Sequence, residues 1–392
     1  MTRSGALRSG IAMIILAVII AGAYSLHATQ GRGAPASFSL LTGAALGIVF
    51  QRGRFCFFCI LRDYIEHRNS GPLFAILTAL AVGGVGYAIV FGAFLPNAMA
   101  GRLPPDAHIG PVSWVTLAAG LAFGLGMALS GACISGHLYR LGEGYSRAPI
   151  ALIGAIGGFA LGFLMWQNLY ISTIVSAPVA WLPATFGYGG SLALHLALLT
   201  IIALLLLRRL PALKGSEGGT LTPRVIWQKV FGERWNPLIT GALVGAIGVF
   251  AYFRVEPLGV TAQLGSVART ILANNGLLEG RLPGLDTFAG CATVVTEAIL
   301  DNGLLIGALV LGSLSMALFS NKFSISRLTL INSVTALLGG ALMGWGAMLA
   351  LGCTVGTLLS GISAFAVSGW VFAAAVFIGV WAGIRLRLHR WG

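Results

Sequence analysis

The sequence predicts an all-α polytopic membrane protein with about ten membrane-spanning segments, arranged as an inverted repeat with broken or re-entrant helices. The chain of 392 residues is 57% hydrophobic and only 9% charged, whereas soluble domains carry roughly 25% charged residues. Its apolar runs are continuous and long enough to cross a bilayer, which does not fit the alternating pattern of a β-barrel. Glycine-flanked cysteines interrupt two of these runs, in GACISG (131–136) and GCTVG (352–356).

The apolar runs define the candidate spans in chain order. The first run follows Arg3 and Arg8 and has no convincing signal-peptide cleavage site, so we interpret it as a transmembrane helix with its N-terminus inside. The run 38–50 is too short to cross alone and is expected to continue into QRGRFCFFCILRD (51–63) as a half-helix. The predicted spans are 11–27, 38–50, 72–95, 111–131, 149–169, 189–207, 237–253, 303–319, 328–350 and 369–385.

The basic residues predict the orientation of these spans. Ten crossings divide the 24 Lys and Arg residues into 19 on one side and 5 on the other. Cytoplasmic loops carry the excess of Lys and Arg, so both termini are predicted to be cytoplasmic, in the inner or plasma membrane. The net charge of +13 is therefore explained by topology, and we predict no nucleic-acid partner.

Internal similarity predicts two repeat halves. When Cys133 is aligned with Cys353, Gly126 falls on Gly346 and Gly136 on Gly356. The segment 41–56 parallels 239–260 less closely. The two cysteine-bearing spans run in opposite directions, which is typical of transporters whose substrate site lies between inverted repeats. We therefore predict that Cys133 and Cys353 lie near one another across a pseudo-two-fold axis, each at a helix break. The predicted units are an N-terminal helix and loop (1–37), a first half (38–207), a cytoplasmic linker (208–236) and a second, inverted half (237–392).

The cysteines are the candidate binding residues. An odd number of five, mostly within or beside membrane segments, does not suit a disulfide framework, and one CxxC supplies only half of a zinc site. Each cysteine alone fits a packing role, but Cys56, Cys133 and Cys353 all occur at predicted helix breaks. Thiols are soft hydrogen-bonding groups, and the backbone N–H groups at a helix start favour anions. Together they suit an anion that carries sulfur, with no metal or cofactor.

Four motifs resemble the YeeE/YedE family of sulfur-compound transporters, and the resemblance extends over most of the chain from about residue 40. They are GRFCFFCILRD (53–63), GMALSGACISGHLYRLGEG (126–144), PLGVTAQLG (257–265) and GGALMGWGAMLALGCTVGTLLSGISAFAVSGW (339–370). The resemblance implies thiosulfate uptake through a pseudo-symmetric bundle, in which a row of cysteines passes the ion along by S–H···S contacts. It also implies a possible partner, a separate cytoplasmic sulfur-carrier protein of the TusA type.

By motif position, the resemblance assigns this role to Cys56, Cys133 and Cys353. Cys59 is a secondary candidate because it forms a CxxC with Cys56, and the choice between these two stays open. Cys291, in TFAGCATVV, is a secondary candidate for lining an entrance. Of the six histidines, only His137 lies close enough in sequence to Cys133 to be considered.

Other functions are less compatible with the sequence. A membrane thiol-disulfide oxidoreductase would use the CxxC pair, but the pair is predicted on the reducing side and no second pair exists. A generic bundle with packing cysteines is a further alternative. Motifs of phosphate loops, zinc proteases and serine hydrolases are absent, so we do not expect an enzyme. Sulfite, sulfide and selenium analogues suit the same contacts as thiosulfate.

Overall fold

The structure is helical throughout the part of the chain that it describes. This computed structural model describes residues 3–29, 31, 33–208, 227–278, 281–285 and 293–391. Within these residues, ten segments are long and apolar enough to cross a membrane, which confirms the ten predicted spans. Their long helices are α1 (Arg3–His27), α2 (Gly33–Gly53), α4 (Leu73–Phe94), α5 (Trp114–Ser130), α7 (Arg147–Leu169), α8 (Pro183–Leu207), α10 (Pro237–Arg254), α12 (Asp301–Phe319), α13 (Leu330–Leu349) and α15 (Val367–Arg385).

Four of the long helices are each followed, after a short break, by a short helical element. These elements are α3 (Phe57–His67) after α2, α6 (Ile134–Gly142) after α5, α11 (Ala262–Asn274) after α10, and η4 with α14 (Thr354–Ser363) after α13. The remaining short elements are η1 (Tyr170–Ile174), η2 (Gln228–Gly232) and η5 (Leu388–Arg390). The predicted half-helix after the short run 38–50 is therefore present as α3, and both cysteine-bearing breaks are confirmed.

The residue types at the breaks explain where the helices end. Gly131 adopts the left-handed conformation directly after α5, which glycine does at no steric cost and which commonly terminates a helix. Arg54 after α2 and Leu351 after α13 also have positive φ. Cys56 and Cys133 then occupy the N-cap positions of α3 and α6 with extended backbone. The sequence thus places a thiol at the start of α3 and of α6, and Cys353 occupies the same position before η4.

Helices α5 and α13 pack directly against each other through glycine. A β-carbon added at Gly126 would lie 2.6 Å from the carbonyl oxygen of Gly339, and one added at Gly339 would lie 2.6 Å from that of Gly126. Gly346 makes the corresponding close approach to Ala119. Small residues permit such contact between membrane helices. A shift of 220 residues, which relates Cys133 to Cys353, also relates Gly126 to Gly346 and Ala119 to Gly339. The contact Gly126–Gly339 therefore corresponds to the contact Gly346–Ala119 with the two helices interchanged.

This offset also relates the following elements, because it takes Arg147, the first residue of α7, to Val367, the first residue of α15. The matched boundaries and exchanged contacts are those that an inverted repeat would give. The two-fold relation of the halves remains a prediction, as do the domain boundaries.

The contacts between α5 and α13 correct one expectation from the pairing of the cysteines, namely that Cys133 and Cys353 lie close together. The helices run antiparallel, so Cys133 follows the Gly126 end of the contact and Cys353 follows the Gly346 end. At about 1.5 Å per residue, the two breaks are separated by roughly 25 Å along the helix pair. The two thiols therefore lie toward opposite ends of the bundle.

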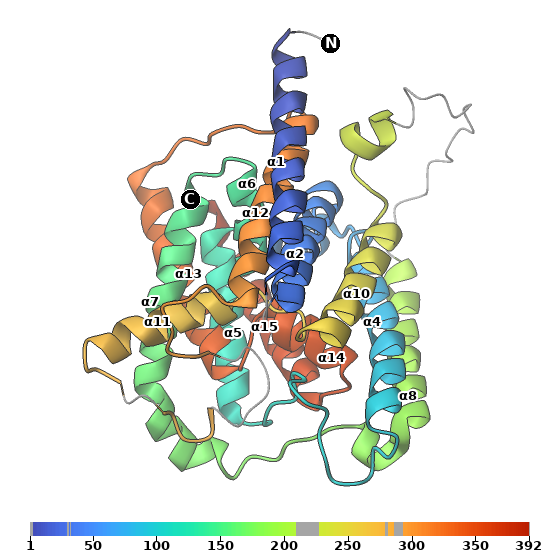
Figure 1. Ribbon diagram of the computed structural model, residues 1–392. Coiled ribbons are helices and arrows are strands. Elements are labelled where there is room, and N and C mark those ends of the chain that lie inside the picture. The colour runs from blue at the N-terminus through green and yellow to red at the C-terminus, as the bar shows by residue number, and fades with distance from the viewer. Residues whose placement is uncertain are drawn as a thin grey trace.

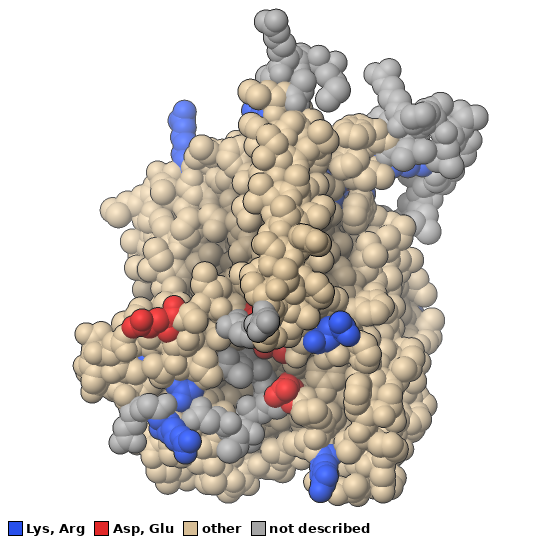
Figure 2. Space-filling model, viewed as in Figure 1, with Lys and Arg blue, Asp and Glu red and all other residues tan. Residues whose placement is uncertain are grey.

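Both ends of the described chain lie toward the same end of the bundle, which is the upper end in Figure 1. We call this end the inner end, after the topology predicted from the Lys and Arg count, and the opposite one the outer end. Figure 2 shows a zone without Lys, Arg, Asp or Glu in the upper half of this face, below basic side chains near the top and above charged side chains that begin at mid-height. Such a zone suits contact with lipid hydrocarbon, in which charges are costly. The protein is therefore a multi-pass membrane protein, as its ten apolar segments require.

Candidate functional site

Two cysteines from separate helix breaks meet in the interior. The Sγ atoms of Cys56 and Cys133 lie 3.9 Å apart, and both residues are fully buried. Cys56 precedes α3 and Cys133 precedes α6, so two helix N-termini converge on this pair. A thiol can donate and accept weak hydrogen bonds, and its sulfur is polarizable. The pair is a compact, soft contact site without lipid exposure.

The sulfur of Cys133 also lies among hydrogen-bonding groups of α6. It is 3.2 Å from the Ser135 hydroxyl and accepts a hydrogen bond of 3.3 Å from the backbone N–H of Gly136. The N-terminal end of a helix carries partial positive charge. A negatively charged group near this pair would therefore meet a hydroxyl, a thiol and backbone dipoles that favour it.

Cys59 faces a different partner. Its sulfur accepts a hydrogen bond of 2.8 Å from Arg140 Nη2, while Arg140 Nη1 donates to the carbonyl oxygen of Gly131 at 3.0 Å. The same guanidinium lies over the ring of Tyr145, at 5.5 Å from the ring centroid. Arg140 thus connects the second cysteine of the CxxC to the glycine that ends α5. The structure brings Cys56 to Cys133, and Cys59 to a fixed cation.

A cavity of about 320 Å³ adjoins Cys59 at the inner end, and we call it the Cys59 cavity. Five cationic side chains and two carboxylates line it, so its net charge is positive. Burial raises the pKa of Glu143, one of the two carboxylates, which accepts a hydrogen bond from Gln51. The charged residues of the lining are Arg54, Arg62, Arg140, Arg234, Lys322, Asp63 and Glu143. Such a cavity raises the local concentration of small anions.

Cys353 lies at the outer of the two cysteine breaks. It precedes η4, is fully buried and belongs to the same hydrophobic core as Cys56 and Cys133. His108 contacts this break, because a β-carbon at Gly352 would lie 3.4 Å from its ring. Burial lowers the pKa of His108 to about 4, which keeps its ring neutral near pH 7. Sequence reasoning missed His108 because it lies in the loop 95–113, far along the chain from Gly352.

The other sequence-predicted site residues have separate outcomes. Cys291 lies outside the described residues. The nearby segment after it is held against α11, since Ser266 accepts a hydrogen bond from the backbone N–H of Val294 and Arg269 donates to the carbonyl oxygen of Thr293. His137 is buried on α6, one turn after Cys133, and its backbone N–H donates to the Cys133 carbonyl oxygen at 2.9 Å.

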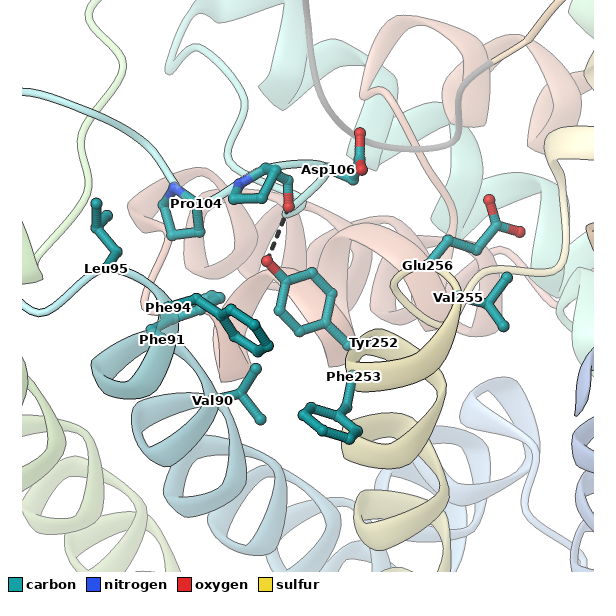
Figure 3. Close-up of a pocket in the computed structure, with 11 residues that line it drawn as sticks. Val90, Phe91, Phe94, Leu95, Pro104, Asp106, Tyr252, Phe253, Val255 and Glu256 are labelled. Atoms are coloured by element: carbon teal, nitrogen blue, oxygen red, sulfur yellow. Dashed lines mark hydrogen bonds between the residues drawn. The ribbon is translucent and has the colours of Figure 1, made fainter. Parts of the chain in front are cut away.

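A further cavity of about 420 Å³ lies between α4, α10 and the loop before α5, and we call it the Tyr252 cavity. Figure 3 shows its aromatic walls, with the carboxylates of Asp106 and Glu256 on one side and the Tyr252 hydroxyl donating to the Pro105 carbonyl oxygen at 2.8 Å. Burial, Asp301 and Asp106 raise the pKa of Glu256 to about 7. Apolar walls beside carboxylates do not attract a dianion, so this cavity is a poor candidate for the anion site.

The helical bundle, with buried thiols at interior helix breaks and a cationic cavity beside them, is the architecture of a polytopic membrane transporter. The chain belongs to the Sulphur transport family, whose match covers residues 52–382. This match confirms the resemblance to YeeE/YedE proteins that the motifs predicted.

Named relatives agree with this assignment. The chain is 29% identical over 366 residues to the thiosulfate transporter TsuA of Escherichia coli strain K12, covering 87% of this chain and 92% of the relative. It is 28% identical over 371 residues to TsuA of Spirochaeta thermophila, covering 90% and 98%. A shorter match, 35% over 171 residues, joins it to the probable transporter YedE of Salmonella typhimurium, covering 43% and 40%. These relatives are named as transporters or probable transporters.

Proposed function

We propose that this protein carries thiosulfate across the inner membrane into the cytoplasm, along a line of reduced cysteines. The observation that carries the proposal is the buried contact of 3.9 Å between the Cys56 and Cys133 sulfurs, beside the cationic Cys59 cavity. The names of the two TsuA relatives support thiosulfate as the ion.

The order of the thiols follows from their places in the fold. Cys353 lies toward the outer end and would meet the ion first. Cys133 and Cys56 lie toward the inner end and would receive it next. Cys59 and Arg140 would then lead it into the Cys59 cavity, where the cations hold the sulfonate oxygens. The outer and inner breaks lie roughly 25 Å apart, and the described residues place no cysteine in the interval between them. Cys353 and the pair of Cys133 and Cys56 would therefore form two separate binding sites and not one continuous row of thiols.

The contacts suit transfer without covalent capture. A thiolate beside a dianion would repel it, so the neutral S–H form is the better partner. The S–H group donates weakly, and soft sulfur contacts are modest in energy. A transport site must bind the ion and also release it, and weak donors at several positions meet this requirement. No bond forms or breaks in the protein during this passage.

The positive Cys59 cavity also suits delivery to a separate carrier at the inner side. We propose that a TusA-like sulfur-carrier protein receives thiosulfate there. The prediction that this side is cytoplasmic rests on the 19-to-5 division of Lys and Arg. The linker 208–236 would lie on the same side, joining the two repeat halves.

Single substitutions of Cys56, Cys133 and Cys353 by serine and by alanine test the relay. Serine keeps a hydroxyl donor but loses the soft sulfur contact, and alanine loses both. Uptake of labelled thiosulfate should therefore fall at least as far in each alanine variant as in the matching serine variant. The losses should be large, because a buried anion without a partner has no water to compensate.

The same measurements, at matched expression, distinguish the alternatives. Near wild-type uptake in all three alanine variants would refute the relay and leave the cysteines in packing roles. A persulfide or S-sulfonate on any of them during turnover would indicate covalent transfer instead. A mixed disulfide between the CxxC and a partner thiol would favour the oxidoreductase. Supplying thiosulfate, sulfite or sulfide singly to a strain without other uptake routes would identify the ion.

A further inference from the structure

A second basic cavity adjoins the Cys59 cavity and shares Arg62, Arg140 and Tyr145 with it. It has a volume of about 260 Å³ and is formed by α3, the α5–α6 break, the start of α7 and the C-terminal turn η5. We call it the Arg147 cavity. Arg62, Arg140 and Arg147 line it together with His137 and His389, and no Asp or Glu is among its lining residues. Its volume would accommodate a small ion with several waters, since a water takes about 30 Å³.

Two of these cations have no carboxylate partner among the described residues. Arg147 Nη2 lies 3.4 Å from the Leu129 carbonyl oxygen and 3.3 Å from the Thr335 hydroxyl, and Arg140 bonds to Cys59 and Gly131. Both sets of partners are formally neutral. By contrast, Arg62 pairs with Asp63 at 2.8 Å, and His389 pairs with Glu66 at 2.9 Å. Neither Arg140 nor Arg147 therefore forms an ion pair within the described residues, although Glu143 lies near enough to Arg140 for their charges to interact across the Cys59 cavity.

His137 supplies an independent sign of a missing ligand. Its side chain is only 2% exposed, and its Nε2 atom has no hydrogen-bond partner among the described residues. The Nε atom of Arg147 is likewise buried without a partner. A buried polar atom without a partner destabilises the folded state, so native structures rarely leave one unless an ion or water satisfies it. Both atoms belong to residues that line this cavity.

We propose that the Arg147 cavity binds a tetrahedral oxyanion with two negative charges or a phosphate group, and that this site is distinct from the cysteine pathway. The planar guanidinium groups of Arg140 and Arg147 match the geometry of such an oxyanion, and each can donate two parallel hydrogen bonds. His137 and Ser130 are also among the residues that line this cavity. The chemistry is shared by free sulfate or phosphate and by the phosphate of a phospholipid headgroup at the inner leaflet.

Binding of sodium sulfate to the purified full-length protein tests the site without any measurement of transport. Sulfate is the right probe because it lacks the soft terminal sulfur that the thiol pair would favour. Calorimetry should detect sulfate binding over sodium chloride at equal ionic strength. Arg147→Gln should weaken it at least tenfold, and His137→Asn should weaken it measurably. His137→Asn keeps the test decisive if Arg147→Gln does not fold, because this variant leaves Arg147, its charge and its packing contacts unchanged.

Two matched controls locate the effect. Arg102→Gln and Arg327→Gln each remove an exposed cation that lines neither the Arg147 cavity nor the Cys59 cavity. Sulfate affinity should stay within about twofold of wild type in both. Equal affinity in wild type and Arg147→Gln, or an equal loss of affinity in either control, would overturn the site.

Native mass spectrometry separates the two sources of the oxyanion. Wild type that retains a phospholipid, which Arg147→Gln loses, would assign the site to a headgroup, and added sulfate should then displace that lipid. Sulfate binding to protein that retains no lipid would assign it to a free ion. If wild type binds neither sulfate nor phospholipid, the proposal is wrong. Because no flux is measured, this result is independent of whether thiosulfate is the transported ion.

Discussion

A β-carbon added at Gly136 would lie 2.7 Å from the sulfur of Cys56 and 3.3 Å from that of Cys133. The absence of a side chain at this one position therefore allows the two thiols to meet. Gly136 belongs to α6, so the helix that presents Cys133 at its N-cap also leaves the space that Cys56 fills.

Gly136→Ala is expected to abolish most thiosulfate uptake and to destabilise the fold by about 1–3 kcal/mol, as overpacking does. The methyl group would separate the sulfurs or displace α3. Gly157→Ala is the matched control, because a β-carbon there meets nothing within 4 Å. Uptake and thermal unfolding of both variants check the prediction. It is contradicted if Gly136→Ala transports like Gly157→Ala.

Arg140→Lys is expected to lower uptake roughly tenfold although it keeps the positive charge. The guanidinium bonds Cys59 and Gly131 at once, and a single ammonium does not reproduce this fork. Cys59→Ala in the Arg140→Lys background should add little further loss, because the contact is already broken. If the losses of uptake in Arg140→Lys and Cys59→Ala were fully additive, the two residues would act separately and the prediction would be wrong. Arg327→Lys, at an exposed position, is the control variant.

Glu256→Gln should change the pH dependence of stability. The folded-state pKa of Glu256 is raised to about 7 from 4.5 by burial, Asp301 and Asp106. Protonation therefore stabilises the folded state, and this contribution is fully present below about pH 4.5 and lost as the pH rises through about 7. From pH 5 to pH 8, the Tm of wild type should fall relative to Glu256→Gln by roughly 2–4 °C. A Tm difference between wild type and Glu256→Gln that does not change with pH would contradict this prediction. Glu297→Gln, at an exposed position, is the control variant.

Reporter fusions should place the two sides of the protein as the Lys and Arg count predicts. A reporter inserted within 208–236 should report the cytoplasm, and one within 96–110 should report the opposite side. The physical reason is that loops rich in Lys and Arg are retained on the cytoplasmic side. Reporters that give the same side for both positions would end this topology.

Local chemistry determined much of this protein from the sequence alone. The number and positions of the spans follow from the length and apolarity of each run against the thickness of a bilayer. The breaks at Gly131 and Gly352 are local too, because glycine readily leaves the helix. The family was identifiable from the motifs around those breaks, since they carry the thiols.

The relations between distant residues were decided only by the tertiary structure. Cys56 meets Cys133 across 77 positions of chain, and Cys353 lies at the opposite end of the α5–α13 pair and not beside Cys133. The aligned glycines suggested that Cys133 and Cys353 lie close together, but a sequence alignment contains no information about distances in space. Where two helices cross is set by which small residues let their backbones touch, as Gly126 and Gly339 do. The same packing placed His108 against Gly352 and Arg140 against Cys59, contacts that no local pattern encodes.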